Sequence, residues 1–155
     1  MTQSVRSHTG PTALIKLGQD VLNTEIAGLA AVRDRLNART PEKAPLVLAL
    51  GLLAACTGRV VVTGIGKSGL VGRKLAATFS STGTPAFFLH PVEGAHGDLG
   101  SLRKDDVIIA ISNSGETAEL NAILPALKSL GTSLIAMTGR EDSTLGRLAD
   151  VTLHS

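Results

Sequence analysis

Residues 107–117 read VIIAISNSGET, an unbroken aliphatic run followed at once by a turn rich in hydroxyl groups. An uninterrupted aliphatic run of this length is typical of a strand that is covered on both faces, as in a parallel sheet. The hydroxyl-rich turn then stands at the carboxyl end of that strand, where open α/β sheets bind their ligands. This stretch therefore predicts both the fold class and the place of the functional site.

The same character continues along the chain, where short aliphatic runs alternate with segments of helical periodicity. Strands are predicted at residues 59–63, 86–90, 107–112, 133–138 and 151–154, and helices between them at 70–81, 117–130 and 143–148. Such alternation predicts an α/β fold, a doubly wound parallel sheet of five strands in the flavodoxin-like order 2-1-3-4-5. Gly83 and Gly131 are expected to end two of the helices.

Two further helices are expected ahead of the first strand. The first is amphipathic and covers residues 13–36, after a flexible polar arm at residues 1–12. The second covers residues 41–57, is mostly buried, and has Thr40 as its N-cap. We expect one domain over residues 13–155.

The composition excludes several classes of partner. The 155 residues include no Trp or Tyr and only three Phe, and the formal net charge is +2. The chain therefore has few aromatic rings on which bases could stack, and no strongly basic surface for a nucleic-acid backbone. The longest apolar run, residues 46–56, is shorter than the roughly 20 residues that span a bilayer. We therefore expect a cytoplasmic protein with neither a nucleic acid nor a membrane as partner. The single Cys56 is interpreted as a small buried hydrophobe.

A second loop of chemical interest follows the first predicted strand and reads GIGKSG at residues 64–69. A P-loop would need glycine where Val61 stands, and a dinucleotide site would need an acidic residue at the end of the second strand, which is missing. What remains is an anion-binding loop at a helix N-terminus, in which Gly66 exposes backbone N–H groups and Lys67 and Ser68 add donors. A tight structural turn is the alternative.

The turn at residues 112–117 places three hydroxyl groups, those of Ser112, Ser114 and Thr117, around a glycine at the start of a helix. Hydroxyl and backbone donors suit a phosphate monoester. A serine-rich helix cap is the alternative, although a cap needs only one of these residues. In the predicted order the first and third strands are neighbours, so both loops face one crevice, which favours phosphate binding.

The connection after the second strand, residues 90–98, reads HPVEGAHGD and is expected to be a polar loop suited to a functional lid. His96 could move protons near neutral pH. His90, Glu93, His96 and Asp98 are an alternative set of metal ligands, but their spacing matches no strong signature. We interpret His90 as a histidine at a strand end that bonds to the backbone.

Glu119 is expected in the first turn of its helix, where the helix dipole favours a carboxylate. It is therefore either a candidate base or only a stabiliser of that helix. A hydrolase triad of Ser68, His96 and Asp98 is a further alternative, but it lacks a nucleophile-elbow motif.

Taken together, these motifs resemble the sugar isomerase (SIS) domain, and most closely the arabinose 5-phosphate isomerases that make the precursor of a lipopolysaccharide sugar. The resemblance extends from Val60 to Leu153 and is carried by residues 64–69, 82–88, 90–91, 96–100 and 111–117. It implies a substrate phosphate held by the two loops. The residues assigned to it are Gly66, Ser68, Ser112, Asn113, Ser114 and Thr117.

The resemblance also implies an active site at Lys67, His96 and Glu119. Aldose–ketose interconversion moves a proton between C1 and C2 through an enediol, and it needs a base and a group that stabilises charge on oxygen. We hypothesise that Glu119 is the base, Lys67 the electrostatic stabiliser and His96 the helper in ring opening or proton transfer. No cofactor and no metal are expected.

The resemblance further implies a homodimer or homotetramer with a small phosphosugar as substrate. Members of the family continue beyond the strand at which this chain ends, into a final helix and a pair of CBS domains, so we expect a domain truncated at its C-terminal end. A non-catalytic phosphosugar-binding or regulatory module is the alternative function. A nucleotide-binding domain is a third hypothesis. It is weakened because neither the P-loop motif nor the dinucleotide motif is complete, and because the chain has few aromatic residues.

Overall fold

The computed structural model describes residues 10–36 and 43–154. Contacts divide the chain into two units, residues 1–39 and 40–155. The first unit contains helix α1 (Pro11–Arg35), which begins two residues earlier than predicted, with its proline in the first turn. Proline is tolerated there because an N–H at that position has no partner within the helix. Residues 1–9 of the predicted polar arm lie outside the described residues, and the single domain over residues 13–155 stays a prediction.

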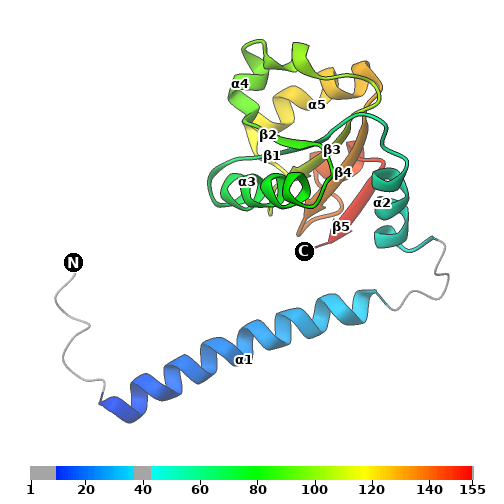
Figure 1. The fold of residues 1–155 in the computed structure, drawn as a ribbon. Coiled ribbons are helices and arrows are strands. Elements are labelled where there is room, and N and C mark those ends of the chain that lie inside the picture. Colours follow the sequence, from blue (N-terminus) through cyan, green and yellow to red (C-terminus); the bar gives the residue numbers. More distant parts are fainter. Residues whose placement is uncertain (1–9, 37–42, 155) are drawn as a thin grey trace. The chain divides into compact units, whose positions relative to one another are not determined.

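The second unit is built on a five-stranded sheet in the order β2-β1-β3-β4-β5, which confirms the predicted order (Figure 1). All four strand pairs are parallel. Each strand lies within one or two residues of its predicted bounds. The strands are β1 (Val60–Gly64), β2 (Ala86–Leu89), β3 (Val107–Ile111), β4 (Ser133–Thr138) and β5 (Val151–His154).

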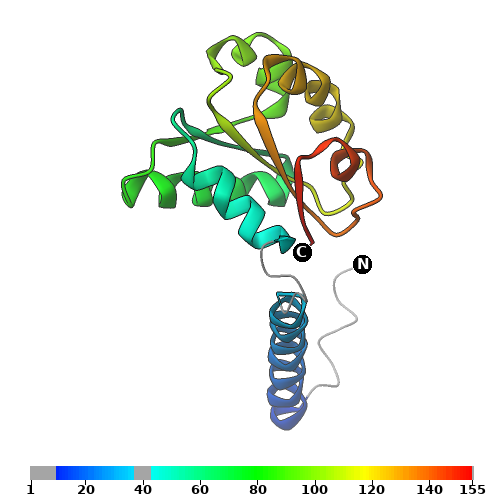
Figure 2. The same ribbon diagram turned by 90° about the vertical axis from the view of Figure 1, so that its right-hand side faces the viewer.

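Helices cover both faces of this sheet (Figures 1 and 2). One face packs against α2 (Pro45–Ala54) and α3 (Gly66–Ser81), with Val60, Val62 and Ile109 in its core. The other packs against α5 (Ala118–Leu130) and α6 (Thr144–Leu148), with Val61, Ile108, Leu120, Leu124 and Leu134 in its core. Because β1 and β3 contribute alternate residues to both cores, they form the buried centre of the fold.

Helix α3 begins at Gly66, whereas a helix from residue 70 was predicted. The glycine pattern of residues 64–69 predicts an anion-binding loop ahead of the helix. The structure shows why the glycines are present: a Cβ at Gly69 would lie 2.8 Å from the carbonyl oxygen of Gly64, and one at Gly72 would lie 3.0 Å from the Phe88 ring. The glycines therefore allow α3 to approach the sheet closely, and they place Lys67 and Ser68 in its first turn.

Helix α2 differs from its prediction in two ways. It begins at Pro45 instead of residue 41, because a proline inside a helix lacks an N–H and clashes with the carbonyl four residues before it. The predicted cap at Thr40 lies outside the described residues. The helix is also not mostly buried: only Ala49 is buried, while Val47, Leu48 and Leu50 are exposed. None of the described helices combines the length and the apolar character needed to cross a membrane.

The connection between β2 and β3 is not the open loop that was predicted. It contains the short helix α4 (Pro91–Ala95) and the 3-10 helix η2 (Asp98–Ser101). Pro91 is the first residue of α4, a position that proline favours. The segment that carries His96 and Asp98 therefore has defined backbone structure.

The amino ends of β1 and β3 are tied together by one buried carboxylate. Asp106 is 1% exposed and accepts hydrogen bonds from the backbone N–H groups of Arg59 (2.8 Å) and Arg103 (2.9 Å). The Arg59 guanidinium lies 3.4 Å from the second carboxylate oxygen. Gly58 has no room for a side chain, because a Cβ there would lie 2.5 Å from Asp106. This anchor stands at the edge of the sheet opposite to the carboxyl ends of the strands.

We expect Asp106→Ala to lower the free energy of unfolding by about 3 kcal/mol, because two backbone N–H groups and a guanidinium lose a shared acceptor. Asp105→Ala is the matched control, since that neighbouring side chain is exposed, and its effect should stay below about 0.5 kcal/mol. Urea unfolding followed by circular dichroism measures both variants. Equal stabilities would contradict the anchoring role of Asp106.

Candidate functional site

The candidate site lies where three connections leave the carboxyl edge of the sheet. Gly64, the last residue of β1, pairs with Ile111, the last residue of β3. On the other side, Thr63 pairs with Leu89, the last residue of β2. The chain segments that follow these strands therefore start at the same level, side by side. This is the arrangement expected from the predicted strand order.

The first connection leads directly into the N-terminus of α3. Gly66 has φ +60°, which favours glycine, and opens the helix. The N-cap residue Ile65 provides no side-chain hydrogen bond to the first turn. The N–H groups of that turn have no acceptor within the helix, so they and the positive end of the helix dipole are available to an anion. Lys67 is exposed and Ser68 is half-buried in this same turn.

The second connection is a turn built from its own hydroxyl groups. Ser112 is only 3% exposed, and its Oγ lies 2.8 Å from Oγ1 of Thr117. The backbone N–H of Gly115 donates to the same Ser112 Oγ at 3.1 Å. Thr117 is the N-cap of α5, but its side chain makes no capping hydrogen bond. The simple helix-cap interpretation therefore does not describe Ser112 and Thr117, since these two hydroxyl groups pair with each other.

Ser114 and Asn113 occupy the exposed part of the turn. Ser114 Oγ accepts the backbone N–H of Glu116 at 3.2 Å. The carbonyl oxygen of Asn113 accepts the backbone N–H of Gly139 at 3.0 Å, while its side chain is exposed. The turn is thus ordered by internal and tertiary hydrogen bonds before any ligand arrives, a property that favours tight binding.

Lys67, His96 and Glu119, the expected acid–base groups, are all exposed. Lys67 lies in the first turn of α3 and Glu119 in the first turn of α5, so each follows one of the two loops. His96 is the C-cap residue of α4, and its backbone N–H donates to the carbonyl of Glu93 at 3.0 Å. The three residues come from the three connections that leave the same edge of the sheet.

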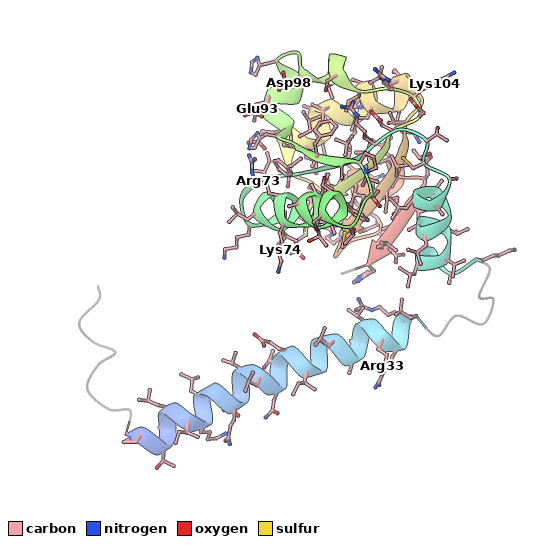
Figure 3. All side chains as sticks on the ribbon, in the orientation of Figure 1. Arg33, Arg73, Lys74, Glu93, Asp98 and Lys104 are labelled. Carbon is pink, nitrogen blue, oxygen red and sulfur yellow. The ribbon has the colours of Figure 1, made fainter. Side chains whose placement is uncertain are left out.

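His90 is a cap of α4, which agrees with its interpretation as a strand-end histidine bonded to the backbone. Its Nδ1 accepts the backbone N–H of Val92 at 3.3 Å. The alternative metal set is not supported: within residues 10–36 and 43–154, no three His, Cys, Asp or Glu side chains are grouped to hold an ion. Glu93 and Asp98 lie on the α4 and η2 segment, where both are exposed (Figure 3).

Glu116 belongs to the turn but is not among the site residues predicted from the sequence. Its Oε1 accepts the backbone N–H of Thr144 at 2.8 Å, at the start of α6. This hydrogen bond lowers the pKa of the Glu116 carboxyl below its ordinary value of 4.5, and the charges of Arg147 and Arg140 lower it further. No local pattern indicates this contact, because Thr144 is 28 residues away.

Two buried polar atoms beside the loops lack a hydrogen-bond partner. They are Oγ1 of Thr63, directly before the first loop, and Oδ1 of Asn121, in α5. Among the described side chains these are the only buried oxygen or nitrogen atoms without a partner. An unpaired buried polar atom costs about 1–3 kcal/mol, and both of these atoms lie near the carboxyl edge of the sheet.

Comparison with known proteins gives a family and several similar proteins. The model of the SIS domain matches residues 53–155. The arabinose 5-phosphate isomerase KdsD of Salmonella typhi is 52% identical over 136 residues, which are 88% of this chain and 40% of that protein. The KdsD of Pseudomonas aeruginosa is 58% identical over 109 residues, which are 70% of this chain and 33% of that protein. The chain thus spans less than half the length of these relatives.

A solved structure shares the fold closely. The Escherichia coli CFT073 protein c3406 in complex with arabinose 5-phosphate superimposes with a TM-score of 0.81 at 45% sequence identity. The match covers 94% of this chain and 74% of that one. The fold likeness therefore extends over nearly the whole chain.

Gly115→Ala tests the close packing of the turn. A Cβ at Gly115 would lie 1.9 Å from Ser143 Oγ, and its φ is +64°. Gly131 also has a positive φ, +78°, but nothing lies within 4 Å of its Cβ position, so Gly131→Ala isolates the backbone strain. We expect Gly131→Ala to cost about 1–2 kcal/mol of unfolding free energy, and Gly115→Ala about 3 kcal/mol or more. Urea unfolding compares them, and a smaller cost at Gly115 would contradict the packing.

Proposed function

The chain belongs to the SIS domain family, and on that premise we propose that it is a phosphosugar aldose–ketose isomerase that interconverts arabinose 5-phosphate and ribulose 5-phosphate. The names of its relatives and the arabinose 5-phosphate bound to a similar structure support this choice of substrate. The reaction redistributes hydrogen within one molecule, so no redox cofactor is required.

The observation that carries the proposal is the pair of uncapped helix N-termini at adjacent strand ends. Helices α3 and α5 both begin there without a side-chain cap. Their dipoles and first-turn N–H groups favour a dianionic phosphate. Neutral donors are added by the Asn113 side chain and by the hydroxyl groups of Ser68, Ser112, Ser114 and Thr117. A neutral donor set binds the phosphate and leaves the positive charge of Lys67 for the reacting end of the sugar.

The chemistry requires groups outside these loops, because the phosphate is on C5 and the reacting carbons are C1 and C2. In the proposal, the Glu119 carboxylate removes the proton from C2 of the open-chain aldose while O1 takes up a proton, which gives the enediol. Glu119 then returns its proton to C1 while the O2 hydroxyl loses its proton, so that a proton has passed in net terms from O2 to O1. Lys67 stabilises the negative charge that develops on the substrate oxygen. His96 assists ring opening by transferring a proton to or from the ring oxygen.

We also propose a homodimer or homotetramer and a cytoplasmic location. The location is supported by the substrate, since a charged phosphate ester does not cross a bilayer unaided. The oligomer is carried over from the family resemblance.

Activity on a panel of pentose and hexose phosphates tests the function. We expect turnover of arabinose 5-phosphate to ribulose 5-phosphate, with a rise in thermal midpoint on adding either sugar. Turnover is followed by NMR, from the loss of the aldose C1 proton signal and the growth of the ketose signals. Stabilisation by the sugar without turnover would favour a non-catalytic binding module, and absence of both would reject the proposal.

Substitution of the acid–base groups tests their roles. We expect Glu119→Gln to lower kcat by about 10²–10⁴-fold, because it removes the base. Lys67→Ala should lower kcat by about 10²–10³-fold, because it removes charge stabilisation in the transition state. Glu141→Gln and Lys74→Ala are matched controls, since both side chains are exposed and lie outside the two loops. Unchanged kcat in Glu119→Gln would reject it as the base.

A further inference from the structure

We infer that Glu116 is a positioning residue, which holds the turn at residues 112–117 in its phosphate-binding shape through a hydrogen bond to the backbone of the β4–β5 connection. The inference rests on the proposed function, because that proposal assigns phosphate binding to the turn. It adds a residue that touches neither the phosphate nor the reacting carbons.

The Glu116 carboxylate joins three segments of the chain. Its Oε1 accepts the backbone N–H of Thr144 at 2.8 Å, the first residue of α6. Its Oε2 lies 3.4 Å from the side-chain amide of Asn121 in α5, and that amide also donates to the carbonyl of Gly115 at 3.3 Å. The turn, α5 and α6 are therefore linked through one exposed side chain.

The β4–β5 connection contacts the turn at two more places. The backbone N–H of Leu145 donates to the carbonyl of Gly115 at 3.1 Å, and that of Gly139 donates to the carbonyl of Asn113 at 3.0 Å. These contacts fix the backbone on both sides of Ser114. Among these contacts, only that of Glu116 is made by a side chain of the turn. A substitution can therefore remove it without changing the backbone groups.

The charge of Glu116 argues against a direct role in binding. A carboxylate repels a phosphate dianion, and both Glu116 oxygens already face N–H donors. The positive charges of Arg147 and Arg140 lower the pKa of this carboxyl in addition to the Thr144 hydrogen bond. Glu116 therefore stays ionised at neutral pH, and an ionised acceptor makes the stronger hydrogen bond.

The first test compares Glu116→Ala with Glu116→Gln. In Glu116→Ala we expect KM for arabinose 5-phosphate and Kd for inorganic phosphate to rise about tenfold, the size of one charge-assisted hydrogen bond. The change in kcat should stay within about twofold, because the acid–base groups are intact. Glu116→Gln should recover part of the affinity, since its amide oxygen can still accept the N–H of Thr144, although its NH2 group cannot accept the Asn121 amide. Glu141→Ala is the charge-matched control and should leave both constants unchanged.

The second test breaks the same hydrogen bond from its other side. Thr144→Pro removes the donating N–H at the first position of α6, which proline favours, and Ser143 before it already has an extended backbone with ψ 167°. We expect it to raise KM as much as Glu116→Ala does, and the double variant to add nothing further. Thr144→Ala keeps the N–H and should have a clearly smaller effect than Thr144→Pro.

A ligand-independent readout separates this inference from the proposed function. Amide hydrogen exchange at Gly115 and Gly139 should be faster in Glu116→Ala and Thr144→Pro, while the thermal midpoint falls by no more than about 3 °C. If the wild type binds neither sugar phosphate nor inorganic phosphate, the proposed function fails. Amide hydrogen exchange then shows by itself whether Glu116 holds the turn in place. The inference is overturned if Glu116→Ala leaves exchange and affinity unchanged, or if it lowers kcat with KM unaltered.

Discussion

The parallel pairing of β1 with β3 is the constraint on which the rest of the site depends. Because Gly64 stands opposite Ile111, the connections after both strands start at the same level of the sheet. Each connection leads into a helix whose first turn lacks a side-chain cap. Two positive helix ends therefore meet at one edge, and the hydroxyl-rich turn between them supplies neutral donors. A shift of this pairing by one residue would move Ser112 to the other face of the sheet.

Close packing at this edge depends on glycines that are costly elsewhere. Gly64 and Gly69 admit no Cβ without contacts under 3 Å to backbone atoms, and Gly115 admits none beside Ser143. Each glycine inside a helix costs about 1 kcal/mol relative to alanine, a cost offset here by the packing of α3 on β1 and β2. These glycines make the sequence resemble a loop, yet they are the residues that let α3 lie close to the strands.

The two edges of the sheet use buried polar groups differently. At the amino edge, the Asp106 carboxylate is surrounded by donors and ties β1 to β3. At the carboxyl edge, Thr63 and Asn121 each keep a buried oxygen without a partner. The buried carboxylate of the amino edge is thus fully paired, whereas two buried oxygens beside the loops are not. Such a division is common where binding requires polar groups that folding alone would pair.

The sequence by itself determined the strands, their order, the glycine stops after α3 and α5, and the two donor-rich loops, because hydrophobic period and turn residues are local signals. Tertiary structure decided the rest. The start of α3 at Gly66 and the exposure of α2 depend on what each helix packs against. The contact of Glu116 with Thr144 joins residues 28 positions apart, and a pairing of that range leaves no periodicity in the chain from which it could be predicted.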